Sequence, residues 1–216
     1  ALQRPGELWL AYQPIVSADG AALARAEALV RWTSPELGPV RPDVFVPVAE
    51  RAGLVIELGR RLLDLVCDDL SAHPGLKVSV NVSPIHLLAP DFLPDLTGML
   101  RGRGIDPGRI EVEITESVLI ADPGLAARRI RALHEAGIGT ALDDFGTGYT
   151  SIGALRQMEF ETMKIDRSYV TGLAGAPDRV ALLSAMILLG HAMGLGVVCE
   201  GVETREELAI LRELGC

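Results

Sequence analysis

Short apolar segments of strand type recur along this chain, and polar side chains stand at or near their ends. The intervals between successive polar positions are 54, 32, 30 and 57 residues, and a lysine divides the last interval into 21 and 36. A (β/α)₈ barrel of ~250 residues uses about 31 residues per strand-helix unit, so these are single and double steps around one ring. We therefore expect the side chains to converge on one rim. They are Glu27, Asn81, Glu113, the pair Asp143-Asp144, Lys164 and Glu200.

Strand-type and helix-type patterns alternate along the whole sequence, which predicts α/β architecture in a single domain over residues 1–216. The expected strands are Trp9–Val16, Ala24–Trp32, Lys77–Ser83, Arg109–Thr115, Gly139–Asp144, Thr162–Asp166 and Gly196–Glu200. Asp19-Gly20 is a hairpin signal, so the first two strands should be antiparallel, whereas the others need helical crossovers. The expected helices are Asp43–Ala52, Leu54–Ala72, Asp91–Arg103, Asp122–Gly137, Asp178–Met193 and Thr204–Gly215.

The ends of two helices are marked in the sequence. Thr204 with Glu207 has the spacing of a capping box, and Gly215 stands where a helix often ends in a left-handed residue. An eighth strand should follow this last helix, but the chain stops at Cys216. We therefore expect a TIM-like (β/α)₈ barrel that is truncated at its C-terminus, lacks its last strand and leaves an open edge.

Composition excludes several classes of protein. The net charge is −9, which argues against binding a nucleic-acid polymer. The mean hydropathy is +0.29, but the most apolar window, Leu182 to Val198, is shorter than the ~20 residues of a membrane span. Three cysteines, Cys67, Cys199 and Cys216, lie far apart in the sequence, which favours reduced thiols that serve packing in a soluble, cytoplasmic protein.

Polar side chains on the inward faces of the strands are unusual, because parallel strands that are buried on both faces are normally apolar. Val78, Val80 and Val82 alternate with Asn81, and a similar alternation turns Glu111 and Glu113 inward. Clustered buried carboxylates repel one another, so a set this dense implies divalent cations or compensating basic side chains.

The donor atoms are all oxygens, which favours Mg²⁺, Mn²⁺ or Ca²⁺ over zinc. Adjacent Asp143 and Asp144 would allow one carboxylate to bridge two ions, the arrangement used for phosphodiester hydrolysis, and Lys164 could orient a water or hold a phosphate. Each residue taken singly could be a surface acid or part of a salt bridge, and only the set predicts a site. A glycine-spaced loop, Phe145 to Ser151, follows the Asp pair, and Thr147 could tie it to Glu116.

Seven ordered motifs resemble those of EAL domains, the cyclic-di-GMP phosphodiesterases. The resemblance extends from about Leu8 to Cys216. The motifs are Tyr12-Gln13-Pro14-Ile15, Glu27-Ala28-Leu29-Val30-Arg31-Trp32, Asn81-Val82-Ser83, Glu113-Ile114-Thr115-Glu116-Ser117, Asp143-Asp144-Phe145-Gly146-Thr147-Gly148-Tyr149, Lys164-Ile165-Asp166 and Glu200-Gly201-Val202-Glu203. Two departures stand out: Thr150 replaces a usual Ser, and a family Gln-Gly-Tyr segment is absent from this sequence.

The resemblance implies a role for each motif residue. Glu27, Asn81, Glu113 and Asp143 would hold one Mg²⁺ or Mn²⁺, and Asp143 with Asp144 a second, with Ca²⁺ inhibitory. Lys164 and Glu200 would position the attacking water. Gln13, Leu29, Arg31, Asp166 and Glu203 would bind or support the dinucleotide, Arg31 at a phosphate, and Glu116 would anchor the loop that contains Thr147.

The expected activity is hydrolysis of cyclic-di-GMP to linear pGpG. The resemblance further implies a homodimer and a parent protein with sensor or cyclase domains. The alternative is a non-catalytic cyclic-di-GMP receptor, although such members usually lack a metal ligand and none is missing here. Spacing and composition alone would also fit an unrelated barrel that uses a divalent metal on an enolate.

Overall fold

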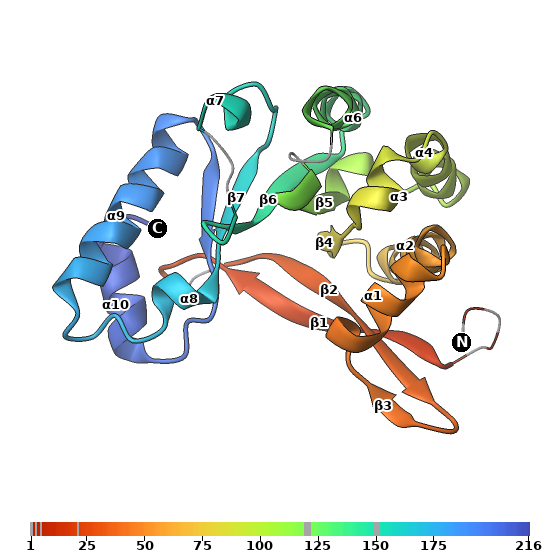
Figure 1. The fold of residues 1–216 in the computed structure, drawn as a ribbon, viewed down its shortest axis with the longest axis horizontal. Helices are drawn as coiled ribbons and strands as arrows, with labels where there is room; N and C mark the ends of the chain where they lie inside the picture. Colours follow the sequence, from red (N-terminus) through yellow and green to blue (C-terminus); the bar gives the residue numbers. More distant parts are fainter. Residues whose placement is uncertain (1, 3, 5, 21, 119–121, 149–151) are drawn as a thin grey trace.

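The fold is a curled, open sheet with helices around its outside, seen in a computed structural model that describes residues 2, 4, 6–20, 22–118, 122–148 and 152–216 (Figure 1). The strand order is β1-β2-β4-β5-β6-β7-β8, with β3 paired to β2. The strands are β1 Leu8–Val16, β2 Leu23–Ser34, β3 Gly38–Val40, β4 Val78–Asn81, β5 Ile110–Thr115, β6 Gly139–Phe145, β7 Thr162–Ile165 and β8 Gly196–Cys199.

The strand directions agree with the expectation from the sequence. β1 and β2 are antiparallel, and every step from β2 to β8 along the path is parallel. β1 and β8 are the two ends of the path among the described residues, so the sheet forms a half-barrel. The short strand β3 was not predicted, because it forms only three residue pairs with the end of β2.

Helices cover the outer face of the sheet. They are α1 Pro42–Arg51, α2 Val55–Ala72, α3 Pro84–Leu88, α4 Phe92–Gly102, the 3₁₀ helix η1 Pro107–Arg109, α6 Pro123–Glu135, α7 Ile152–Leu155, α8 Arg167–Val170, α9 Pro177–Ala192 and α10 Arg205–Glu213. In Figure 1, α2, α4 and α6 lie on one side and α9 with α10 on the other. The single-turn helices α3, α7 and α8 were not predicted, since one turn carries too little periodicity to be recognised.

Alternation along the strands separates the core from the inner face. Val78 and Val80 on β4 are buried in the main hydrophobic cluster with residues of α2, α4 and α6. Ser79 and Asn81 alternate with them and point to the opposite face, as pleated strand geometry requires. This inner face is where the polar side chains of the neighbouring strands gather.

Capping interactions fix the ends of the predicted helices. Asp122 accepts a hydrogen bond from the N–H of Leu125, and Thr204 and Glu207 form the predicted capping box at the start of α10. Gly215 ends α10 with a φ of 78°, as expected for the residue after a helix. Within the described residues, none of the helices is both long enough and apolar enough to cross a bilayer.

Candidate functional site

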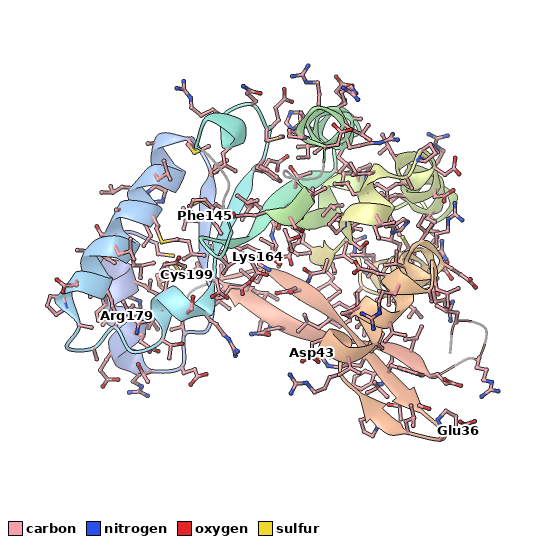
Figure 2. All side chains as sticks on the ribbon, viewed as in Figure 1. Glu36, Asp43, Phe145, Lys164, Arg179 and Cys199 are labelled. Carbon is pink, nitrogen blue, oxygen red and sulfur yellow. The ribbon has the colours of Figure 1, made fainter. Side chains whose placement is uncertain are left out.

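Lys164, on β7, lies at the centre of the polar cluster and is only 2% exposed. Its Nζ is 2.7 Å from Glu113 Oε2, 2.8 Å from Glu200 Oε1, 3.0 Å from Asp143 Oδ1 and 3.3 Å from Glu27 Oε2. Figure 2 shows Lys164 in the middle of the molecule, whereas Glu36, Asp43 and Arg179 lie at its outer edge. One buried ammonium therefore lies within ion-pair distance of four carboxylates from four other parts of the chain.

Strand register explains why these side chains meet. Asn81 at the end of β4 is level with Glu113 on β5, and Asp143 on β6 is level with Thr115, two residues further along β5. Glu200 directly follows β8, and its N–H bonds to Ile165 O at 3.1 Å. The carboxyl ends of parallel strands share one edge, so the spacing seen in the sequence becomes a rim in space.

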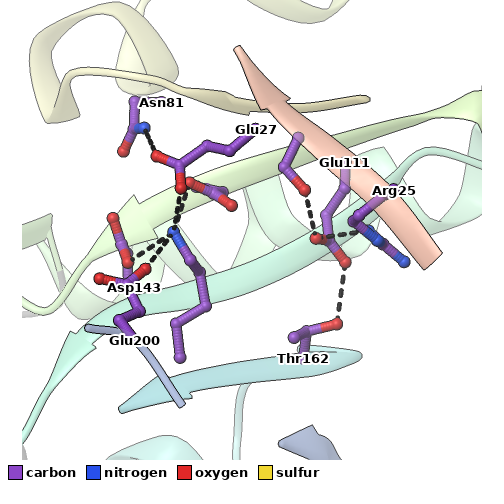
Figure 3. A network of polar contacts seen from close by, with 10 residues as sticks. Arg25, Glu27, Asn81, Glu111, Asp143, Thr162 and Glu200 are labelled. Atoms are coloured by element: carbon purple, nitrogen blue, oxygen red, sulfur yellow. Dashed lines mark hydrogen bonds and ion pairs between the residues drawn. The ribbon is translucent and has the colours of Figure 1, made fainter. Parts of the chain in front are cut away.

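Asn81 and Asp144 join the cluster in different ways. The Asn81 side-chain amide donates to Glu27 Oε1 at 2.8 Å (Figure 3). Asp143, Asp144 and Glu200 each present one oxygen, and these atoms lie within 4.8 Å of one another. Asp144 has a φ of 55°, the only positive value among the described non-glycine residues, at a break in the β6–β7 register. Such strain is tolerated where a side chain must be aimed at a site.

Burial and mutual repulsion shift the protonation of the cluster. Burial raises the pKa of Glu113 to about 8, assisted by Glu27 and opposed by Lys164. Burial is also the main reason that the pKa values of Asp144 and Glu200 are raised. Burial alone would lower the pKa of Lys164, but the surrounding carboxylates, Glu113 foremost, outweigh burial and raise it. Lys164 is therefore a fixed positive charge near neutral pH.

The donor set fits divalent cations. Glu113 Oε1 is buried and has no hydrogen-bond partner among the described residues, so it is free to bind an ion. Asp143 Oδ1 lies within ion-pair distance of Lys164 Nζ, but the angles are wrong for a hydrogen bond. If all five carboxylates lost their protons on binding cations, they and the one ammonium would carry a formal charge of −5 + 1 = −4, which two divalent cations would offset. Carboxylate and amide oxygens suit Mg²⁺ and Mn²⁺.

The loop after Asp144 is held from both sides at Gly146. The N–H of Gly146 donates to Glu116 Oε1 at 2.8 Å, and the hydroxyl of Tyr169 donates to Gly146 O at 2.6 Å. Glu116 therefore contacts this loop, but through Gly146, whereas the Thr147 hydroxyl donates to Asp144 O at 2.9 Å. The role of Tyr169 was not predicted, because no spacing pattern in the sequence links it to Gly146.

The predictions for the end of this loop cannot be compared with the fold. Tyr149, Thr150 and Ser151 lie outside the described residues, and with them the Thr150 departure.

A cavity of about 590 Å³ opens beside the cluster. Its lining includes Leu29 and Arg31 within β2, Asn81 at the end of β4, Thr115 at the end of β5, and Ser117 after it. The Arg31 guanidinium donates to the carbonyl of Val30 at 2.9 Å through Nη1, which leaves its other N–H groups available to a ligand. Two of the five predicted nucleotide-binding residues thus line a cavity next to the acidic rim.

The other three predicted nucleotide-binding residues lie around the cluster and outside its hydrogen-bond network. Gln13 is exposed on β1, directly across from Glu27 in the antiparallel register. Asp166 caps α8 by accepting from the N–H of Ser168 at 2.9 Å. Glu203 is exposed, and its N–H donates to Glu207 Oε2.

His86 on α3 is one of the residues that line the cavity. The side chain is 2% exposed, and its ring meets the Phe92 ring edge-on at 4.8 Å. Within the part of the chain that the structure describes, its Nε2 has no hydrogen-bond partner, and burial lowers the pKa of His86 to about 4. His86 is therefore neutral near pH 7.

A second buried carboxylate, Glu111, lies lower on the same strand as Glu113. It accepts hydrogen bonds from Ser79 Oγ at 2.9 Å and Thr162 Oγ1 at 2.8 Å, and pairs with Arg25 (Figure 3). Both oxygens are thus occupied by neighbouring side chains, so this network is structural.

Comparison with known proteins agrees with this geometry. The model of the EAL domain family matches residues 1–216. The chain is 34% identical to the bifunctional diguanylate cyclase/cyclic di-GMP phosphodiesterase MucR of Pseudomonas aeruginosa, covering 100% of the chain and 32% of that protein. It is 33% identical to the cyclic di-GMP phosphodiesterase NbdA of the same organism, over 99% of the chain and 28% of NbdA.

The fold of this chain also matches solved structures over almost its whole length. A solved structure of the PaMucR phosphodiesterase in complex with c-di-GMP aligns with a TM-score of 0.91 at 33% identity. The alignment covers 97% of this chain and 87% of that one. The chain spans about a third or less of the curated relatives it matches first.

Proposed function

We propose that this chain, which belongs to the EAL domain family of cyclic-di-GMP phosphodiesterases, hydrolyses cyclic-di-GMP to linear pGpG. The observation that carries the proposal is the convergence of Glu27, Glu113, Asp143 and Glu200 on one buried lysine at the strand ends. Carboxylates that are this close together and shielded from water repel one another. Their clustering is typical of a site that binds cations for catalysis.

Two ions would be held by overlapping sets of ligands. Glu27, Asn81, Glu113 and Asp143 would hold one, and Asp143 with Asp144 the other, with Glu200 close to both aspartates. When bound, Mg²⁺ or Mn²⁺ would supply a water of lowered pKa and would offset the charge on the scissile phosphate. Ca²⁺ would inhibit, because its larger and more flexible coordination shell would not keep the same geometry.

Lys164 and Glu200 would orient the attacking water. Lys164 is a fixed cation with three donor hydrogens, and Glu200 can accept a hydrogen bond beside it at 2.8 Å. Lys164 would hold the water oxygen, and Glu200 would receive the water's proton as the new P–O bond forms. The scissile P–O bond would break on the opposite side of the phosphorus, and the leaving sugar oxygen would take a proton from solvent. The raised pKa of Glu200 suits it to this role.

The neighbouring cavity would receive the nucleotide. Arg31 would bind a phosphate oxygen through its free N–H groups, and Leu29 would give an apolar surface to a base. Gln13, Asp166 and Glu203 would contribute polar contacts from the surrounding segments, Gln13 from the position opposite Glu27. The apolar lining beside charged groups is usual for a small-ligand site.

Glu27→Ala tests the assignment. The variant should release no pGpG from cyclic-di-GMP in Mg²⁺ or Mn²⁺ while its circular dichroism spectrum stays that of the wild type. Glu57→Ala, at an exposed position on α2, is the control and should retain turnover. Unchanged pGpG release by Glu27→Ala would refute the proposal. Binding of cyclic-di-GMP by the wild type without pGpG release would instead support the receptor alternative.

The chain would act as one module of a larger cytoplasmic protein. Its relatives are about three times longer, which leaves room for the sensor or cyclase domains expected from the family resemblance. We propose that it works as a homodimer. Sedimentation of the chain with and without cyclic-di-GMP tests this, and a monomer under both conditions would contradict it.

A further inference from the structure

Two cysteines that are 17 residues apart in the sequence lie side by side in the fold. Cys216 Sγ is 3.4 Å from Cys199 Sγ, and both thiols are free. Each is partly exposed, so a small reagent can reach the pair. The third cysteine, Cys67, lies on helix α2 and is fully buried in the hydrophobic core.

Two independent elements hold this pair in place. Cys199 is the last residue of β8 and pairs with Ile165 on β7. Cys216 follows Gly215, whose left-handed backbone turns the chain back so that the N–H of Cys216 bonds to Leu211 O at 3.0 Å. This is the long hydrogen bond of a Schellman motif, which fixes the residue two positions after the end of a helix. The thiol contact thus follows from helix capping and strand pairing.

We propose that Cys199 and Cys216 form a reversible intramolecular disulfide that joins the end of α10 to the end of β8. The S–S bond length is about 2.05 Å, so the sulfurs must approach by about 1.4 Å, a shift that side-chain rotation can supply. The site is a redox modification site for a low-molecular-weight disulfide such as oxidised glutathione.

The exchange conserves atoms and electrons. The thiolate of one cysteine attacks a sulfur of oxidised glutathione, forming a mixed disulfide and releasing one glutathione thiolate. The second cysteine then loses its proton and attacks the protein sulfur of the mixed disulfide, which expels the second glutathione thiolate. Two cysteine thiols are oxidised, oxidised glutathione is reduced, and the two protons go to the two glutathione molecules released.

The bond would act on the neighbouring rim by fixing the end of β8. Cys199 directly precedes Glu200, whose Oε1 lies 2.8 Å from Lys164 Nζ. Successive side chains of a strand point to opposite faces, so the disulfide would lie toward α10 while Glu200 stays on the inner face. A bridge closing a loop of this length is expected to raise the Tm by about 6 to 12 °C.

Peptide mapping and thermal unfolding test the proposal without any assay of hydrolysis. Chain 1–216 is incubated with oxidised glutathione, and its intact mass and tryptic peptides are compared with those of the reduced chain. We expect a mass lower by two hydrogen atoms, a peptide pair linked through Cys199 and Cys216, and a Tm higher by the stated amount, all reversed by dithiothreitol. On oxidation, Cys67→Ala should show the same mass change, the same linked peptides and the same rise in Tm as the wild type, although the loss of a core side chain lowers its starting Tm.

Two variants keep the outcome decisive. Cys199→Ala and Cys216→Ala should each retain one glutathionyl group on the remaining partner and show no rise in Tm. A wild-type chain that keeps glutathionyl groups on separate cysteines, links through Cys67 or forms only intermolecular bridges would overturn the proposal. A cross-link without a rise in Tm would overturn its stabilising role. Neither result bears on whether the chain hydrolyses cyclic-di-GMP.

Discussion

Replacing Lys164 with methionine should strongly destabilise the metal-free protein. The substitution removes the one ammonium that lies within 3.3 Å of four carboxylates while keeping a side chain of similar length. Lys164 is 2% exposed and Glu113 is 1% exposed, so water cannot take over the role of the lost charge. Breaking a buried pair in this way leaves carboxylates uncompensated, and the remaining groups must bind protons or the fold must open.

The size of the effect follows from this burial. Removing one partner of a buried ion pair usually lowers the free energy of unfolding by about 3–5 kcal/mol. For a domain of roughly 200 residues, this corresponds to a Tm lower by about 6 to 20 °C. Glu27 and Glu200 are partly exposed, with side-chain exposures of 14% and 29%, so their contribution is screened and the lower half of the range applies.

Urea and thermal unfolding in a chelator at about pH 7 measure the loss. Lys77→Met is the matched control, because Lys77 is the only other lysine of the sequence and is exposed. It should change the unfolding free energy by less than about 0.5 kcal/mol. A chelated Lys164→Met protein as stable as Lys77→Met would refute the electrostatic account of the cluster.

Divalent cations provide a second, independent readout. A ligand at a hundredfold excess over its Kd stabilises the folded state by about 2.7 kcal/mol. Because the variant has lost a competing positive charge, Mg²⁺ or Mn²⁺ should bind it more tightly and raise its Tm more than that of the wild type. An equal rise in both proteins would show that Lys164 and the cation do not share the same carboxylates.

Three further changes have calculable consequences. Burial lowers the pKa of His86 in the folded protein to about 4, and the Arg60–Asp95 pair lies nearby. The contribution of neutral His86 to stability is therefore complete above about pH 6.5 and is lost as the pH falls toward 4. In urea titrations, the free energy of unfolding should fall by about 2 kcal/mol more between pH 7 and pH 5 in the wild type than in His86→Gln. Gly201→Ala would place a Cβ 2.4 Å from Arg167 Cβ at a φ of 71°, so it should lower the free energy of unfolding by about 2–4 kcal/mol in the same urea titration. Gly194→Ala is the control, because Gly194 has a similar φ of 77° but open space around it, and it should lower that free energy by only about 1–2 kcal/mol. Thr204→Ala removes the capping hydroxyl of α10 and should lose about 1 kcal/mol, with equal stability of the two proteins contradicting the capping box.

The rim of polar residues could be predicted because two periodicities act together. Alternation within a strand decides which side chains point inward, and the strand-helix repeat decides that their ends meet. Glu27, Glu113, Asp143 and Glu200 satisfy both conditions, and the fold brings them to one lysine. The capping box of α10 could also be predicted from the sequence, because its two residues are three positions apart and interact locally.

Contacts between distant segments without a repeat could not be predicted. The hydroxyl of Tyr169 reaches Gly146 only because α8 packs beside the loop after β6. Cys199 and Cys216 looked unrelated in the sequence, and their contact depends on where the end of α10 meets β8. Such pairs need the packing of whole elements, which no local pattern encodes.

Glu111 and Glu113 show what strand register adds to alternation. Both point inward from β5, both are about 1–2% exposed, and the sequence gives them the same pattern. Register places Glu111 level with Ser79 on β4, where Arg25, Ser79 and Thr162 satisfy its oxygens. Glu113 lies one inward position higher, level with Asn81, and its Oε1 has no hydrogen-bond partner in the described ranges of the chain. The height of a carboxylate along the barrel axis therefore separates a structural acid from one that is free to bind an ion, and that height is fixed only when the strands pair.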